Sequence, residues 1–393
     1  MKVPLFFCVR QSKSRLSAAL MEIKMRGVIE SNLFHTIFSL MADNSFLLYG
    51  ANGYTGELIA RYAVEYDLHP VLAGRRKDAI ESLAAKLNQP YNVFDVNDTD
   101  ALSASLKGVK LIINAAGPFQ FTARQIINAC LKTSTHYLDI NGDIQVFEFI
   151  REYDDAAKQA GIMIMPGGGF DVVPTDCTAL LLKKLLPDAI DLKLAFAARG
   201  GRLSHGTATT MVNKLGEAGA ARKNGNIIRQ PLGKKGMWID FGVKKVFAMT
   251  IPWGDVATAY YTTKIPDIES YSAVSPTIYR LLKMQSLFNW LFRTKFIRQV
   301  LRNKINKRAA GPSDEQRSKA VSLVWGQVSN ARGEKATITM QTPNGYTLTA
   351  HSVLVIAKKI LQGNLKTGYQ TPASAYSEDL IMEVPGVKRQ IKK

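Results

Sequence analysis

The sequence has few cysteines, no long apolar run and a shortage of acidic residues. Its 393 residues include three cysteines, Cys8, Cys130 and Cys177, with no CxxC motif or Cys/His cluster. This spacing argues against a disulfide framework and a zinc site, so we expect a cytoplasmic protein without a metal. No run approaches the roughly 18 apolar residues of a membrane-spanning helix. A hydrophobic content of 46% and a charged content of 21% are typical of a globular protein.

The acidic deficit leaves a formal net charge of +19, from 51 basic and 32 acidic residues. Such a surplus attracts nucleic acid, anionic lipid or an anionic small molecule. The sequence has no zinc-finger spacing, no aromatic RNP run and no helix-turn-helix pattern, so we expect no nucleic-acid partner.

The hydrophobic pattern predicts an α/β fold of two domains. Residues 1–40 lack a clean period and a signal-peptide cleavage site, so we expect a disordered extension or a misassigned start. From Phe46 short apolar strands alternate with helical segments, which predicts a doubly wound parallel Rossmann sheet over residues 41–170. This part includes a predicted helix over residues 145–160.

Beyond residue 170 the pattern predicts a second α/β domain with a mixed sheet, over residues 171–385, for substrate binding or dimerisation. A basic tail, residues 386–393, would follow. Homodimerisation is left open. The predicted strands of this domain cover residues 191–198, 246–251, 258–264, 320–328 and 335–341, and a helix covers residues 346–361.

A glycine-rich turn, Gly50-Ala-Asn-Gly-Tyr-Thr-Gly56, lies between the first predicted strand and helix. In dinucleotide sites such glycines permit a tight turn, close approach of backbone N–H groups to pyrophosphate, and close helix–strand packing. The alternative is an ordinary strand–helix turn without a ligand. The cofactor-binding candidates here are Gly50, Asn52, Gly53, Tyr54, Thr55 and Gly56.

The second strand ends in Ala-Gly-Arg75-Arg76, where an NAD site would carry an acidic residue on the ribose. Arginine instead offers bidentate, charge-assisted bonds to a 2′-phosphate. The pair therefore predicts NADP, although a solvated helix start is the alternative.

Small residues close the fourth strand, and Asp95 follows the third. The first group would let a dinucleotide lie across the strand ends, and Asp95 would border the adenine. An ordinary strand–loop junction and a helix cap are the respective alternatives. The candidates after the fourth strand are Ala115, Ala116, Gly117 and Pro118.

Two polar segments, residues 136–143 and 166–177, follow the fifth and sixth strands. Both should face the crevice where ligands bind in such sheets. Asp171 would orient substrate or the nicotinamide ribose, or satisfy the backbone of its glycine loop. Asp176 is expected to be a first-turn helix acid.

These segments together resemble the saccharopine dehydrogenase-like family. The resemblance rests on the Gly50–Gly56 turn, on residues 73–76, 114–119, 136–143 and 167–176, and on two later runs, residues 204–207 and 368–373. It is closer to the branch with trans-acting enoyl reductases than to lysine-pathway enzymes. The family implies a Rossmann domain, a second α/β domain and reduction by NADPH, and it does not imply saccharopine as the substrate.

We therefore expect hydride transfer from NADPH to a C=C or C=N bond of a small-molecule or acyl substrate. Tyr137, Asp171 and His205 are the catalytic candidates, as proton donors or stabilisers of charge. A non-catalytic NADP-binding sensor is the alternative. A short-chain dehydrogenase mechanism lacks its acid, because the one Tyr-x-x-x-Lys spacing, Tyr279 to Lys283, lies far from the dinucleotide domain.

Residues 279–308 carry nine basic residues and no acidic one, interleaved with apolar residues at helical spacing. A helical pair packed on the second domain is one interpretation. The alternative is a peripheral contact with an anionic membrane surface, or a cover over a long acyl substrate.

Overall fold

The computed structural model describes residues 44–200, 204–214, 216–283, 294, 298–300, 303, 305 and 310–392. The predicted extension, residues 1–40, and most of residues 284–309 lie outside this part. Contacts group residues 46–393 into one unit. In the described ranges, no helix combines the length and the apolar character needed to cross a membrane.

A seven-stranded parallel sheet holds the predicted Rossmann domain, and the predicted fold class is confirmed. Its strand order is β15-β6-β5-β4-β1-β2-β3, so the order reverses between β1 and β4. β4 is buried along its whole length, as expected for a central strand that begins with the apolar run 111–113. The strands are β1 (Ser45–Tyr49), β2 (His69–Gly74), β3 (Tyr91–Val93), β4 (Leu111–Asn114), β5 (His136–Asp139), β6 (Met163–Met165) and β15 (Gly368–Tyr369).

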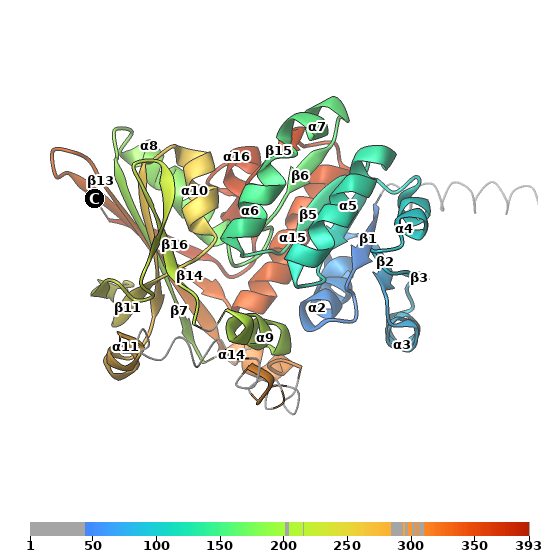
Figure 1. Cartoon of the computed structure of the whole chain (residues 1–393), viewed down its shortest axis with the longest axis horizontal. Helices are drawn as coiled ribbons and strands as arrows, with labels where there is room; N and C mark the ends of the chain where they lie inside the picture. Colours follow the sequence, from blue (N-terminus) through green and yellow to red (C-terminus); the bar gives the residue numbers. More distant parts are fainter. Residues whose placement is uncertain are drawn as a thin grey trace, which may run out of the picture. The chain divides into compact units, whose positions relative to one another are not determined.

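Helices cover both faces of this sheet (Figure 1). One face packs against α2 and α15, and the other against α4, α5 and α6. The helices are α2 (Tyr54–Tyr62), α3 (Lys77–Leu87), α4 (Thr99–Leu106), α5 (Phe119–Thr133), α6 (Ile144–Arg151), α7 (Asp154–Gln159) and α15 (Gly345–Leu361), with a 3-10 turn at Ala63–Tyr66.

A second, mixed sheet of nine strands has the order β10-β11-β12-β7-β13-β14-β16, and β8 joins β12 and β9 at the side. β12 and β7 pair in parallel and the other described pairs are antiparallel. The strands are β7 (Asp191–Arg199), β8 (Gly219–Lys223), β9 (Asn226–Gln230), β10 (Gly236–Asp240), β11 (Lys245–Ile251), β12 (Asp267–Ala273), β13 (Val321–Ser329), β14 (Lys335–Pro343) and β16 (Lys388–Lys392).

Two helices, α8 and α10, pack on one face of the second sheet around Leu194, Ile268 and Val328. The opposite face has its own core, which includes Phe241, Tyr271 and Trp325. The helices of this part are α8 (Val173–Leu185), α9 (His205–Asn213), α10 (Asp255–Thr263), α11 (Pro276–Lys283), α14 (Asp314–Lys319) and α16 (Pro372–Tyr376), with a 3-10 turn at Leu380–Glu383.

Three expectations about elements were wrong. The strand predicted over residues 258–264 is instead the end of helix α10 and its C-cap Lys264, although Thr and Tyr are frequent there. The helix predicted over residues 145–160 is two helices, α6 and α7. The C-terminal residues are not a tail, because β16 pairs with β14 along five residues. The domain boundary near residue 170 stays a prediction.

Candidate active site

The glycine turn joins β1 to α2 and has the backbone geometry of a phosphate cradle. Gly50 has a φ of +84°, a conformation that residues with a Cβ rarely adopt. A Cβ on Gly56 would lie 2.3 Å from the Gly50 carbonyl oxygen. Gly53 is the N-cap of α2 and offers no side-chain acceptor. The N–H groups of the first turn of α2 therefore stay available to an anion.

The two arginines that follow β2 come directly after a strand end that hydrogen-bonds to this turn, since Gly50 donates to the Ala73 carbonyl oxygen. Arg75 and Arg76 are exposed, and within the described chain neither has an ion-pair partner. Asn52 reaches across from the turn, since a Cβ on Gly74 would lie 3.1 Å from its Oδ1 atom. Two unpaired guanidinium groups next to the cradle fit a 2′-phosphate, and so the residues present fit NADP.

The ends of β3 and β4 complete this edge. Ala115 donates to the Tyr49 carbonyl oxygen over 2.8 Å, which ties the end of β4 to the end of β1. Ala116 lies against Gly50, because a Cβ on Gly50 would come within 2.7 Å of its nitrogen. Gly117 and Pro118 are exposed. Asp95 is also exposed and accepts hydrogen bonds from both nitrogens of Asn97, so its carboxylate already caps a local turn.

The side chain of Tyr54 turns away from the cradle. Its hydroxyl donates to the Pro312 carbonyl oxygen over 2.6 Å and accepts from Arg317 over 2.9 Å. A Cβ on Gly311 would lie 2.4 Å from its ring. Of Tyr54, only the backbone therefore remains for the cofactor. Thr55 follows it in the first turn of α2 and is partly buried.

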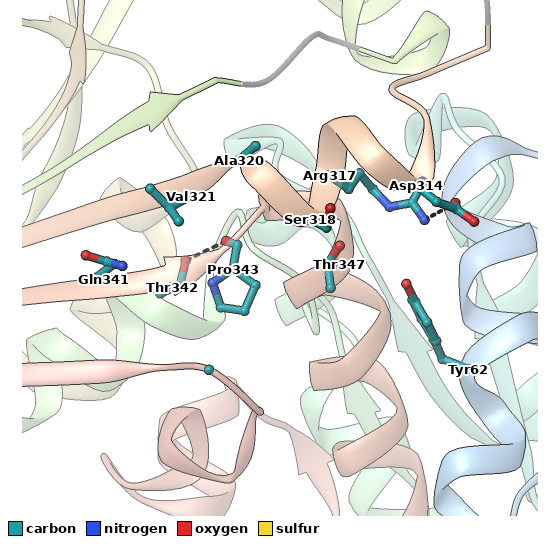
Figure 2. A pocket seen from close by; sticks show the side chains of 11 residues that line it. Tyr62, Asp314, Arg317, Ser318, Ala320, Val321, Gln341, Thr342, Pro343 and Thr347 are labelled. Carbon is teal, nitrogen blue, oxygen red and sulfur yellow. Dashed lines mark hydrogen bonds and ion pairs between the residues drawn. The ribbon is translucent and has the colours of Figure 1, made fainter.

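Arg317 also lines a pocket of about 470 Å³ between α2, α14, β13 and β14. Figure 2 shows its guanidinium directed at the carboxylate of Asp314, with Tyr62 on the α2 side. Asp314 also accepts two hydrogen bonds from Arg61 of α2. Hydrogen bonds from Arg61 and Arg317 hold the pKa of Asp314 well below its usual range. These ion pairs join α14 to α2.

Contacts at its two ends tie helix α9 to α15 and to the segment after β5. At its N-terminal end, Ser204 donates its backbone N–H to the Tyr346 hydroxyl over 2.6 Å. The Tyr346 ring packs edge-on against Tyr54, with 5.1 Å between centroids. Just beyond the helix, Lys214 pairs with Asp143 over 2.7 Å.

His205 is the first residue of α9 and is partly buried. Its backbone N–H donates to the Ala310 carbonyl oxygen over 2.8 Å. The structure therefore places His205 in the first turn of α9, one residue after Ser204, which contacts Tyr346.

Asp171 follows β6 and lies beside the end of β5. A Cβ on Gly142 would come within 2.5 Å of its Oδ2 atom. Burial raises the pKa of Asp171 to about 6, while nearby Lys214 lowers it. Among the described residues, none donates a hydrogen bond to this carboxyl, although the Asp171 carbonyl oxygen accepts one from Trp253 over 3.0 Å. A partly buried carboxyl in this state can give or take a proton near neutral pH.

Tyr137 lies in the core and not in the crevice. Its side chain is fully buried. Its hydroxyl donates to Asp139 over 2.8 Å and accepts from Asn114 over 3.2 Å. Asp139 also accepts from the backbone N–H of Gly167. This network joins β4, β5 and the loop after β6, so the expectation that Tyr137 acts on substrate is corrected to a supporting role.

Two other buried acids, Asp176 and Asp255, form hydrogen bonds that join helices. The Asp176 carboxylate accepts from Thr262 over 2.6 Å and from the Ala373 backbone over 2.8 Å. The expectation of a simple first-turn acid thus misses its role in joining α8 to α10 and α16. Asp255 accepts from Thr175 over 2.6 Å, and burial raises its pKa to about 8. Sequence reasoning also missed Lys214 and Tyr346, because their contacts span long stretches of chain.

The comparisons with known proteins agree with this geometry. The family model described as the saccharopine dehydrogenase NADP binding domain matches residues 46–165. A Mus musculus protein named saccharopine dehydrogenase-like oxidoreductase is 24% identical over 202 residues, which are 45% of this chain and 47% of that protein. A Mycobacterium leprae protein named trans-acting enoyl reductase is 28% identical over 154 residues, or 36% of each chain. The matched part thus spans about half the length of the mouse relative and about a third of the length of the bacterial one.

A solved structure, apo saccharopine dehydrogenase (L-Glu forming) from Saccharomyces cerevisiae, aligns with a TM-score of 0.63 over 89% of this chain and 100% of that one. Its sequence identity is 14%, so this likeness concerns the fold alone. The resemblance predicted from the sequence is therefore confirmed: residues 46–165 form an NADP-binding domain similar to that of saccharopine dehydrogenase.

Proposed function

We propose that this chain reduces a C=C or C=N bond with NADPH, and that Asp171 supplies the proton. The observation that carries the proposal is the position of Asp171. Its carboxyl lies at the ends of β5 and β6, beside Gly142, with no hydrogen-bond donor among the described residues and a pKa raised to about 6. In an open α/β sheet, ligands bind outside these strand ends.

The cofactor supplies the hydride, and the chain must bind it, orient the substrate and provide a proton. The first turn of α2 and the guanidinium groups of Arg75 and Arg76 would hold the phosphates. The hydride would go to one atom of the double bond and the Asp171 proton to the other, which leaves a carboxylate. Lys214 lies close enough to lower the pKa of Asp171 and would stabilise that carboxylate.

The rival proposal, an NADP-binding sensor without turnover, makes no use of Asp171. A single assay separates the two, namely loss of reduced-nicotinamide absorbance with a panel of enoyl thioesters, enones and imines. We expect turnover with at least one class, and a large loss in the Asp171→Asn variant. Asp100→Asn, an exposed acid in the first turn of α4, is the matched control. NADPH binding without turnover of any acceptor would favour the sensor.

A further inference from the structure

An exposed patch of mixed apolar and basic character lies on the outer edge of the second sheet, away from the candidate active site. Its apolar members are Trp238, Val243, Ile278 and Leu281, with exposed fractions of 63%, 59%, 50% and 64%. Its basic members are Lys244, Lys245, Arg280 and Lys283. We call these eight residues the β10–α11 surface.

The patch has a defined framework. Trp238 of β10 pairs across the strands with Phe247 of β11, and their rings lie 5.6 Å apart. Phe247 in turn contacts Tyr279 of α11 over 5.1 Å. These rings hold α11 against the hairpin, as seen beside β11 in Figure 1. A surface hollow of about 390 Å³ lies between the two elements, lined by Trp238, Lys244 and Lys245 among others.

Within the described part of the chain, the four apolar side chains of this surface stay outside the hydrophobic cores. α11 contains Ile278, Leu281 and Leu282, yet none of its residues is buried. Trp238 points outward while its strand neighbour Ile239 fills the core on the other face. Large apolar residues gathered on one exposed patch indicate an interaction site.

The charged members of the patch are all basic. Asp240, the one acid on β10, already pairs with Lys392 over 3.6 Å and faces Lys245 across the strands. Lys244, Lys245 and Arg280 form no ion pair with any other residue the structure describes. An exposed tryptophan among aliphatic and lysine side chains suits the interface of a bilayer, where rings and methylene stems enter the headgroup region and ammonium groups meet lipid phosphates. Nucleic acid would leave the aliphatic side chains in water.

We infer that the β10–α11 surface docks on an anionic lipid surface. Each lysine or arginine near such a surface contributes about 1 kcal/mol of attraction. The apolar side chains would insert into the headgroup region and strengthen the binding. This inference does not depend on the proposed reaction. It places peripheral membrane contact on residues that the structure describes, and these include the start of the basic segment at residues 279–308.

The test is flotation of the full chain with vesicles of phosphatidylcholine, with and without phosphatidylglycerol, at low and high salt. We expect binding to the anionic vesicles at low salt, reduced by salt. Lys244→Glu/Lys245→Glu should weaken it at least about tenfold, since two attractive charges become repulsive. The control is Lys107→Glu/Lys132→Glu, which replaces two exposed lysines of the first domain and changes the net charge by the same amount. It should leave vesicle binding unchanged. Unaltered NADPH binding would verify that both variants are folded.

A second readout follows Trp238 itself. Brominated lipid should quench part of the tryptophan fluorescence of the bound protein, because the Trp238 ring enters the bilayer interface. The Trp238→Phe variant should lack this quenched part. Equal binding of the glutamate variant, absence of vesicle binding, or absence of this quenching would overturn the inference. A Trp238→Ser variant that changes the oligomeric state but not vesicle binding would also overturn it, and so would binding to nucleic acid but not to vesicles. Each result would assign the surface to another partner.

Discussion

Asp171 differs from the other acids near it in what its carboxyl contacts. Asp139, Asp176 and Asp255 each accept hydrogen bonds from side chains or backbone that hold the fold together. No described residue donates a bond to Asp171, and Lys214 is its nearby cation. Satisfied buried acids serve structure, and an unsatisfied one at a strand end is a candidate for chemistry.

A pH profile tests this role. A proton donor must be protonated, and the pKa of Asp171 is raised to about 6. We therefore expect kcat to fall as the pH rises through that value. Asp171→Asn should lower kcat by roughly 10²–10⁴-fold, the usual contribution of a general acid, and should abolish this limb of the profile. A variant with the wild-type rate and profile would contradict the assignment.

Asp255 gives a stability prediction of defined sign. Its pKa is raised to about 8 by burial, so the folded state keeps a proton that the unfolded chain releases near pH 4. The contribution to stability is full below pH 4 and is lost as the pH rises through 8, at up to about 1.4 kcal/mol per pH unit. Asp255→Asn should flatten this dependence in urea unfolding between pH 5 and 8. Parallel curves for the two proteins would refute it.

Residues that act through local sequence could be predicted, and those that act at a distance could not. Arg75 and Arg76 follow a strand that the pattern identifies, so their position alone predicts a contact with the 2′-phosphate, and both are exposed in the structure. Lys214 is 71 residues from Asp143 by number, yet the two pair over 2.7 Å. Tyr137 was misjudged because it lies within β5, which helices cover on both faces, and not beyond the carboxyl end of that strand.

Among the elements, the β1–α2 turn is the most constrained. The Cβ of an alanine at position 56 would meet the Gly50 carbonyl oxygen at 2.3 Å and the Ala51 Cα at 2.9 Å. Because both atoms belong to the backbone, α2 itself would have to shift.

Gly56→Ala should therefore destabilise the protein by about 1–3 kcal/mol, as overpacking does, and should weaken NADPH binding because the α2 N-terminus moves. Thermal unfolding and cofactor titration measure the two effects. Gly206→Ala is the control, because its Cβ would have 3.9 Å of room. If Gly56→Ala left the thermal unfolding midpoint and the NADPH affinity unchanged, the turn would not be as tightly packed as the structure indicates.

The elements that could be predicted are those with a clear period and flanking turns. The strands and helices from β1 to β5 follow the alternation, and Asp98 caps α4 as its sequence indicates, by accepting from the Ala101 backbone. Helix α10 was mistaken for a strand because its threonines and tyrosines favour strands. Tertiary packing decides instead, since Val256 and Ala259 are fully buried under the second sheet.

In the whole molecule, the last part of the chain contributes to both sheets. β15 adds to the parallel sheet beside β6, and β16 pairs with β14 in the mixed sheet. Tyr369 of β15 is 2% exposed, and its carbonyl oxygen accepts from Tyr261 of α10 over 2.8 Å. Sequence patterns did not reveal this, because two-residue and edge strands carry almost no period.

A chain ending at Lys366 should consequently lose much of its stability, because it lacks β15, α16 and β16. A chain ending at Gly386 lacks only the largely exposed edge strand β16 and should melt closer to the full chain. Thermal unfolding of the three proteins compares them. Similar midpoints for the chain ending at Lys366 and the full chain would show that β15 and α16 contribute little.

The central claim is that this chain binds NADPH at the glycine turn, with the 2′-phosphate on Arg75 and Arg76. Calorimetric titration of NADPH and NADH into the wild type and Arg75→Ala/Arg76→Ala tests it most directly, with Lys132→Ala as the control for a lost charge. We predict tighter binding of NADPH by the wild type, and a loss of about 2–4 kcal/mol of that preference in the double variant, given the usual strength of charge-assisted hydrogen bonds. Equal affinity of the wild type for the two cofactors, or an unchanged preference in the double variant, would contradict the account.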